Sequence, residues 1–418
     1  MAGDGNASPL KKDALLAFES GQQGASDLLA QALKRDPNDG ALLIAQSACL
    51  LRERSPEPFS AIKRTLDKHP DWVEGHKALS KLKSEAGAPN PLSSIEDALE
   101  KLPKHPRLWM GYLTLLGSAG RHSEAAQKTA QLRQSIGDLP VLRIVEARHR
   151  GFAGEAKVAQ SLLEGLPPEL PELGFELARN TMRLGDFETA SVALAELVTK
   201  NPEDIGAWAL LELCWRVLDH PRHKWLCPSA GIYAQFDLGL SKSELCELTD
   251  SLRNLHVTRS APLGQSVEGG TQTHGDLKLR SEPAIRDLFE RIEHTLAQYA
   301  LNLPQLAASH PLALLQSRTP EICASWSILL TSGGRHVPHL HDGGRISSAV
   351  HIAVPENLKE GEGELQLGLP PEDIPLQVKP LASFKPRPGH LVLFPSFLYH
   401  STSRFLDGER LTVAFDAV

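Results

Sequence analysis

Histidines are concentrated in one short stretch of this chain, GGRHVPHLHDGGRISSAVHIAVP at residues 333–355. The stretch contains four of the 17 histidines among 418 residues. His339 and His341 are two residues apart, so on extended backbone their side chains point to the same face, about 7 Å apart along the chain. Neutral imidazole is a common metal ligand, and two rings placed in this way can bind one ion. The spacing therefore predicts a metal site.

Two later segments carry residues that can complete such a site. In GHLVLFPSFLYHSTSRF, His400 follows a strand-like run and an aromatic turn, and it can supply a third imidazole. Ten residues further on, Arg410 begins the strand-like segment RLTVAFD, with Thr412 on the same face. Arginine holds a carboxylate through two parallel hydrogen bonds, and a neighbouring hydroxyl can add a third. We therefore expect Arg410 and Thr412 to bind a carboxylate.

Short strand-like runs surround these residues and must position them. The runs are β-branched or aromatic and are bounded by Gly, Pro or Asp; they are ASWSILLTS, ISSAVHIAVP, GELQLGL, HLVLFP and RLTVAFDAV. Two helical patterns precede them, one from about residue 241 and one in EPAIRDLFERIEHTLAQYALNL, where apolar residues recur at helical spacing. Several short strands preceded by helices predict a small sandwich or jelly roll with helices packed outside it.

The first half of the chain follows a longer period. Prolines close similar phrases at steps of 31 to 36 residues, at Pro37, Pro70, Pro106, Pro140, Pro171 and Pro202. Between them lie pairs of amphipathic helical patterns, clearest where Gly185 and Asp186 make the turn and Ala190 begins a closely packed helix. This resembles the tetratricopeptide repeat, a helix-turn-helix unit of about 34 residues. The resemblance implies a solenoid whose concave face binds peptide, or one that only holds its companion domain.

Four phrases in order, spanning about residues 262–416, resemble the 2-oxoglutarate/Fe(II)-dependent oxygenase family that is often fused to tetratricopeptide repeats. They are LGQSVEGGTQTHGDL, SWSILLTSGGRHVPHLHDGGRISSAVHIAVP, GEGELQLGLP and PRPGHLVLFPSFLYHSTSRF with ERLTVAFD. The resemblance implies a double-stranded β-helix fold, Fe(II) as the metal, and 2-oxoglutarate and O2 as cosubstrates. It also implies that Arg410, assisted by Thr412, holds the distal carboxylate of 2-oxoglutarate. His351 stands where related folds often have a tyrosine that contacts 2-oxoglutarate, or it is a buried strand histidine satisfied by a neighbour.

The ligand set departs from the pattern that this resemblance implies, in which His-x-Asp and a distal histidine form a facial triad. Three sets remain open: His339, His341 and His400; a set that uses His341 with Asp342; or two histidines with water in place of the carboxylate. We favour the first, because Asp342 directly follows His341 and would start on the opposite face of a regular strand. The flexible Asp-Gly-Gly segment can still turn Asp342 inward. His336 is expected outside the ligand set.

Together these patterns predict an α+β, multidomain protein. Residues 8–222 would form an all-α tetratricopeptide-like solenoid, and residues 228–418 a jelly-roll domain with flanking helices. The expected function is hydroxylation, dependent on Fe(II) and 2-oxoglutarate, of a peptide or protein recruited by the concave face of the repeats. Two alternatives remain: a non-catalytic interaction protein with a degenerate metal-binding jelly roll, and a three-histidine dioxygenase that oxidises thiols without 2-oxoglutarate. Both leave Arg410 and Thr412 unexplained.

Composition and charge narrow the classes of partner. A formal net charge of −7 without a dense Lys/Arg run argues against a nucleic-acid-binding surface. Nowhere do 18 apolar residues run together, and the segment MAGDGNASPLKKDALLAF lacks a basic start followed by a long apolar run. The five cysteines are scattered without a CxxC pair, which suits reduced thiols. We therefore expect a cytoplasmic protein without membrane or nucleic-acid partners.

Overall fold

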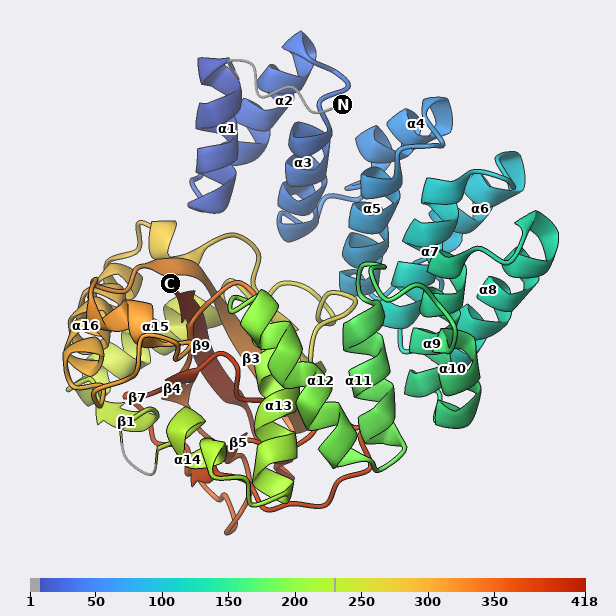
Figure 1. Ribbon diagram of the computed structural model, residues 1–418. Helices are drawn as coiled ribbons and strands as arrows, with labels where there is room; N and C mark the ends of the chain where they lie inside the picture. Colours follow the sequence, from blue (N-terminus) through green and yellow to red (C-terminus); the bar gives the residue numbers. More distant parts are fainter. Residues whose placement is uncertain (1–7, 229–230) are drawn as a thin grey trace.

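The computed structural model describes residues 8–228 and 231–418, in which a run of helices precedes two β-sheets (Figure 1). The helices of the first part are α1 (Pro9–Glu19), α2 (Ala25–Arg35), α3 (Gly40–Arg52), α4 (Ser60–Lys68), α5 (Val73–Glu85), α6 (Ser93–Lys101), α7 (Pro106–Ser118), α8 (His122–Ile136), α9 (Pro140–Phe152), α10 (Ala156–Leu163), α11 (Leu173–Arg183), α12 (Phe187–Lys200), α13 (Ile205–Val217) and α14 (Arg222–Leu226).

The second part contains the strands and two longer helices. These elements are β1 (Ala234–Asp237), α15 (Lys242–Arg253), β2 (Val267–Gln272), α16 (Pro283–Leu301), β3 (Ile322–His336), β4 (Ile346–Ala353), β5 (Leu365–Leu367), β6 (Ala382–Phe384), β7 (His390–Pro395), β8 (His400–Thr402) and β9 (Arg410–Ala417). The predicted α+β order, helical repeats followed by a region of antiparallel sheets, is confirmed.

The helices form antiparallel pairs that follow the proline period. Pro106 and Pro140 are the first residues of α7 and α9, where proline needs no amide hydrogen bond. Between α11 and α12 the turn contains Gly185, whose φ of +87° suits glycine. The Asp186 side chain then caps α12 by accepting a hydrogen bond from the Thr189 amide. The proline spacing therefore marks helix pairs, as the repeat resemblance predicts.

Two antiparallel sheets make up the second part of the chain. The larger sheet has the strand order β1-β7-β4-β9-β3-β2, and the smaller has the order β6-β5-β8. In the larger sheet Thr412 of β9 lies between Ile328 of β3 and His351 of β4. Side chains from both sheets line one common cavity. The sheets therefore enclose a space, as the jelly-roll prediction requires.

Four strands lie outside the runs that the sequence pattern identified, namely β1, β2, β6 and β8. Strand β2 lies in the Gly- and Thr-rich segment and pairs with β3 at the edge of the larger sheet. A Cβ atom on Gly270 would lie 2.4 Å from the backbone oxygen of Leu329, so only glycine fits this close to the neighbouring strand. Because this edge strand buries few apolar side chains, it lacks the alternation that identifies strands.

The main hydrophobic core is continuous across the last repeats and the sheets. It contains Trp208 and Trp215 of α13 together with Leu391 and Phe394 of β7, all at most 5% exposed. The sequence pattern changes near residues 220–228, but the packing does not separate there. We therefore expect α11 to α13 to fold together with the sheets.

One edge of the helical solenoid contacts the sheet region, and the helices arch over that region (Figure 1). The contacts come from the C-terminal ends of the first helices of several pairs. Ser260 donates a hydrogen bond of 2.6 Å to the backbone oxygen of Ser84 in α5. Arg216 near the end of α13 donates to the backbone oxygen of Gly368. Part of the repeat surface is therefore used within the chain itself.

A buried ion cluster fastens α11 to a loop of the sheet region. Asp373 accepts hydrogen bonds of 2.7 and 2.9 Å from Arg179 and from Arg183. Burial alone would raise the pKa of Asp373, but the hydrogen bonds and charges of the two guanidinium groups outweigh it and hold the pKa below its usual range. Among the described residues, Asp373 is the sheet-region acceptor to which both arginines donate.

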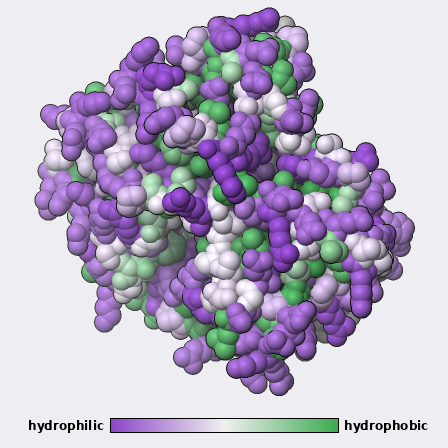
Figure 2. All heavy atoms as spheres, turned by 180° about the vertical axis from the view of Figure 1, so that it is seen from behind, coloured by the Kyte–Doolittle hydropathy of each residue, from purple (hydrophilic) through white to green (hydrophobic). Residues whose placement is uncertain are grey.

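Polar and charged residues cover most of the face shown in Figure 2, with apolar residues in patches between them. No helix in the described part of the chain combines the length and the apolar character needed to span a bilayer.

Candidate metal centre

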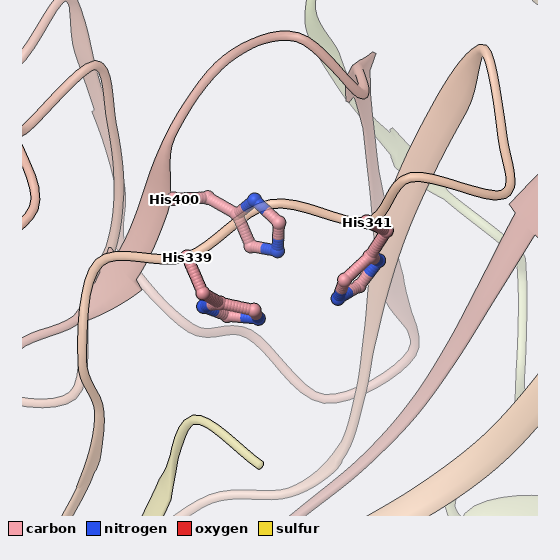
Figure 3. Close-up of side chains that lie close together, drawn as sticks. All are labelled: His339, His341 and His400. Atoms are coloured by element: carbon pink, nitrogen blue, oxygen red, sulfur yellow. The ribbon is translucent and has the colours of Figure 1, made fainter. Parts of the chain in front are cut away.

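Three imidazoles converge in the sheet region, and Figure 3 shows their rings turned toward one another. His339 and His341 follow β3, and His400 begins β8. His339 and His400 exchange backbone hydrogen bonds of 3.0 and 3.1 Å, which hold the two segments side by side. Each residue offers a ring nitrogen within 4.8 Å of the others, and the ring centroids are 4.1 to 5.0 Å apart. The structure thus brings together the three histidines that the spacing singled out.

The Nδ1 atoms of all three rings face hydrogen-bond acceptors. In His339 and His400, Nδ1 lies 2.9 and 3.3 Å from the backbone oxygen two residues earlier. In His341, Nδ1 lies 2.8 Å from the carboxylate of Asp416. Since a carbonyl or an ionised carboxylate can only accept, each neutral ring carries its proton on Nδ1 and has its lone pair on Nε2. This is the tautomer in which a histidine can bind a metal ion through Nε2.

Burial keeps two of these rings neutral. It lowers the pKa of His339 to about 3, and the neighbouring His341 acts in the same direction. Burial also lowers the pKa of His400 well below its usual value, again assisted by the other two rings. Metal ions bind the neutral form of imidazole, so near neutral pH these two rings need lose no proton to bind one.

Arg410 is a buried cation with unused donors. Its side chain is 2% exposed, and its Nη2 atom lies 3.3 Å from Nδ1 of His351. Its Nε and Nη1 atoms have no hydrogen-bond partner in the described part of the chain. Burial lowers the pKa of Arg410 to about 10, which still leaves the group charged at neutral pH. Because unused donors on a buried cation are costly unless an anion binds them, Arg410 has the features of an anion-binding group.

Thr412 and His351 take different places around Arg410. Arg410 and Thr412 line the same cavity as the three histidines, as strand alternation along β9 predicts. His351 is fully buried on the neighbouring strand β4, but it is not among the described residues that line the cavity. Its ring contacts Arg410, so it is placed to orient the guanidinium group rather than to touch a bound molecule.

Asp342 lines a different cavity from the one that the three rings line. It is exposed and, together with Leu340 and Tyr399, lines a larger space between the repeats and the sheets. Leu340 and Asp342 alternate with His339 and His341, and successive residues of extended backbone point to opposite sides. The structure therefore does not bring Asp342 into the cluster of histidines.

Asp416 was not identified from the sequence. It continues the inward alternation of Arg410, Thr412 and Ala414 along β9, and its carboxylate holds Nδ1 of His341. That alternation was the available signal, since Asp416 lies four residues beyond Thr412 and so shares its strand parity. A carboxylate behind a metal-binding histidine fixes its ring and raises its basicity.

Trp326 was also missed as part of the site, whereas His336, expected outside the ligand set, lies directly beside it. Trp326 of β3 lies edge-on to His341, with ring centroids 5.2 Å apart. His336 stacks on His339 and its Nδ1 atom lies 2.8 Å from the hydroxyl of Ser266. Both line the same cavity as the three rings. Strand β3 runs further than the apolar pattern indicates, which places His336 beside the cluster rather than at the surface.

The space around these groups, called the imidazole cavity below, has a volume of about 50 Å³. Hydroxyl and amide groups such as those of Ser348 and Gln272 line it, along with the apolar walls of Trp326 and Ile328. None of the described residues that line it is acidic. A divalent ion held by three neutral imidazoles would keep its positive charge, so the cavity favours a small anion beside the metal.

One family model matches this region of the chain. Residues 324–416 match the family described as "Putative 2OG-Fe(II) oxygenase". No curated protein sequence matches the chain.

Two prolyl hydroxylases and a helical repeat protein are among the solved structures that resemble the chain. A prolyl-4-hydroxylase from Pseudomonas putida is 17% identical, with 45% of this chain and 94% of that chain covered and a TM-score of 0.31. A prolyl hydroxylase from Trichoplax adhaerens, in complex with a hypoxia inducible factor peptide fragment, is 14% identical, with 48% and 92% covered and a TM-score of 0.32. A tetratricopeptide repeat protein from Parabacteroides merdae is 16% identical, with 52% and 88% covered and a TM-score of 0.36.

The family match spans strands β3 to β9 of the sheet region. Residues 324–416 match the 2OG-Fe(II) oxygenase family, and an N-terminal region of helical repeats precedes them.

Proposed function

We propose that this chain is a dioxygenase that depends on Fe(II) and 2-oxoglutarate. His339, His341 and His400 hold Fe(II) through their Nε2 atoms, and Arg410 with Thr412 holds the distal carboxylate of 2-oxoglutarate. The observation that carries the proposal is Arg410, a buried cation whose Nε and Nη1 atoms have no partner among the described residues, in the cavity that also contains the three imidazoles. A purely structural metal site has no use for such a cation.

The residues present fit both groups. Three ring nitrogens with free lone pairs suit a metal ion that leaves positions for cosubstrates, and a planar guanidinium group suits a carboxylate. Bound Fe(II), together with 2-oxoglutarate and O2, supplies an oxidant for an unactivated C–H bond, while 2-oxoglutarate becomes succinate and CO2.

The residues of this chain supply the geometry. Asp416 accepts the Nδ1 proton of His341 and so leaves Nε2 of that ring free. His351 accepts a hydrogen bond from Arg410 and so orients the guanidinium group. The apolar side chains of Trp326 and Ile328 line the cavity and limit the water around these groups. Charge interactions inside the cavity are stronger as a result.

We further propose a peptide or protein as the primary substrate, with the repeats in residues 8–222 recruiting it for the sheet domain in residues 228–418. The architecture supports this, because a helical solenoid offers an extended surface and a large cavity separates its last repeats from the segments that carry the histidines. Since the sheets already occupy one edge of the solenoid, we expect substrate contacts beside that edge.

Metal binding and succinate formation test the proposal. After anaerobic reconstitution the full chain should bind about one Fe(II), as three facial ligands require, and in air it should form succinate only when 2-oxoglutarate is supplied. A chain that binds iron but neither binds nor consumes 2-oxoglutarate would support the non-catalytic alternative. Thiol oxidation that proceeds without 2-oxoglutarate would support the three-histidine thiol dioxygenase instead.

A further inference from the structure

The second, larger cavity has no role in the proposed chemistry. It has a volume of about 1180 Å³ and lies between the repeats and the sheet region. Residues from α9, α11, α12 and the start of α13, with the loops between them, form one side of it. Leu340, Asp342 and Tyr399 form the other side, and each is next in sequence to a histidine of the cluster. We call this space the acidic cleft.

Charge distinguishes the acidic cleft from the imidazole cavity. Among the described residues that line the cleft, seven are acidic and three are basic. Two of the three basic groups are already paired, Arg148 with Glu172 and Glu176, and Arg179 with Asp373. In the described part of the chain Glu169, Glu196 and Asp342 form no ion pair, and all three are exposed. The cleft therefore carries a surplus of negative charge that faces solvent.

Glu176 adds an observation of a different kind. It lines the cleft and is 4% exposed. Its Oε1 atom accepts a hydrogen bond from Arg148, while its Oε2 atom is buried with no partner among the described residues. A buried carboxylate oxygen without a donor is costly. A donor carried in by a bound molecule would remove that cost.

Apolar side chains accompany these carboxylates. Phe175, Leu170 and Leu340 also line the cleft. A lysine or arginine side chain has an apolar stem that can pack on such groups, while its charged end reaches a carboxylate. A nucleic acid or an acidic peptide would be repelled by the surplus of negative charge. The lining thus matches a basic peptide in both its apolar groups and its charge.

We propose that the acidic cleft binds a basic segment of the protein substrate, with a lysine or arginine side chain reaching Glu176 and other basic residues near Glu169, Glu196 and Asp342. This inference rests on the proposed function, because it names the class of substrate on which the proposed dioxygenase acts. The cleft and the imidazole cavity lie on opposite sides of the segments that carry the histidines. The cleft therefore selects the partner, and residues outside the bound segment react.

The test measures binding to the full chain without metal or 2-oxoglutarate. The probe is a short fluorescein-labelled peptide of alternating lysine and serine, and its partner peptide has glutamate in place of lysine. Fluorescence anisotropy should show saturable binding of the lysine peptide that weakens as salt is raised, and no saturable binding of the glutamate peptide. Equal binding of the two peptides would overturn the proposal.

Charge reversal locates the binding site. The double variant Glu169→Lys/Glu196→Lys should weaken binding of the lysine peptide by about tenfold or more, the scale of one lost charge-assisted contact. The matched control is Glu356→Lys/Glu360→Lys, which reverses two exposed acidic residues outside the cleft. It should change the affinity little. Equal weakening by both pairs would mean that only net charge matters, and would overturn the proposal.

Glu176→Gln provides a second measurement, because it keeps the side-chain shape and removes the charge. This variant should weaken binding of the lysine peptide. Its circular dichroism spectrum should match that of the wild type, which shows that folding is unaffected. If this variant does not fold, the charge-reversal pair still decides the question. If succinate forms but the lysine peptide does not bind, only the proposal for the cleft is rejected. If the peptide binds but 2-oxoglutarate is not turned over, only the proposed function is rejected.

Discussion

The imidazole cavity and the acidic cleft lie on opposite sides of the same short segments. The first measures about 50 Å³ and is lined by imidazoles and Arg410, with no acidic residue among the described residues of its lining. The second measures about 1180 Å³ and has a surplus of carboxylates. In His339 to Asp342 the two linings alternate residue by residue, as extended backbone requires. One stretch of four residues can thus serve two chemistries, because alternate side chains do not share a cavity.

The strongest test of this division removes one residue from each side. His400→Ala should lower metal affinity by on the order of 100-fold or more, since changes behind a ligand already cost about 10- to 100-fold. Asp342→Ala should leave metal binding almost unchanged, because its side chain lines the cleft. Anaerobic calorimetry with Mn(II) measures both. If Asp342→Ala loses metal as fully as His400→Ala does, the carboxylate turns inward and the division fails.

A second test concerns the wall of the cleft. Asp373→Ala should lower the free energy of unfolding by about 3–5 kcal/mol, because it leaves Arg179 and Arg183 largely buried without their shared carboxylate. Urea denaturation followed by circular dichroism provides the measurement. Glu356→Ala, at an exposed site, is the control and should change little. An unchanged unfolding free energy for Asp373→Ala would mean that this cluster does not hold α11 to the sheet region.

Arg410 tests the other side of the comparison. Removing a bidentate, charge-assisted contact should cost roughly 3 kcal/mol, or about a hundredfold in affinity. Arg410→Leu should therefore weaken 2-oxoglutarate binding by that factor while metal binding is retained. Arg410→Lys should recover only part, because a point charge cannot reproduce the planar fork. Anaerobic calorimetry with Mn(II) in place of Fe(II) provides the measurement, and equal affinity of Arg410→Leu and wild type would reject the proposed role.

Asp416 allows a finer test of the imidazole cavity. Asp416→Asn keeps the size of the side chain but weakens the acceptor that holds His341. Metal affinity should fall by about 10- to 100-fold, less than after loss of a ligand. The ratio of the two losses, measured with Mn(II), separates a supporting residue from a ligand. A loss as large as that of His400→Ala would indicate that Asp416 binds the metal directly.

The smallest effect concerns pH and a histidine outside both cavities. Burial lowers the pKa of His256 from 6.5 to about 4, so between these values the unfolded chain binds more protons than the folded one. Stability is therefore present above the unfolded pKa and is lost as pH falls through this window. Lowering the pH from 7 to 5 should cost about 2 kcal/mol from this residue. Urea denaturation at the two pH values should show a smaller loss in His256→Gln, and identical losses would contradict the assignment.

Local patterns in the sequence predicted much of the fold. The proline period marks the helix pairs, and the β-branched runs mark β3, β4, β5, β7 and β9. Spacing alone also placed His339 with His341, and Arg410 with Thr412, on common faces. These features follow from backbone geometry within a few residues, where the periods of helix and strand decide which way a side chain points.

Other features depended on contacts between distant residues. The edge strand β2 lacks apolar alternation, and it forms because β3 offers it a partner. The continuous core that joins α13 to β7 crosses the position where the sequence pattern changes. Neither feature has a signal within its own segment, because pairing and packing with remote residues stabilise it.

The sequence by itself determined which residue types could bind a metal and an anion, and on which face of its strand each one lies. Only the tertiary structure decided that His400 pairs with His339, that Asp416 holds His341, and that Asp342 lies on a separate, acidic cleft. The physical reason is that strand parity sets the direction of a side chain relative to the local backbone. Which groups meet there depends on how segments far apart in the sequence pack together.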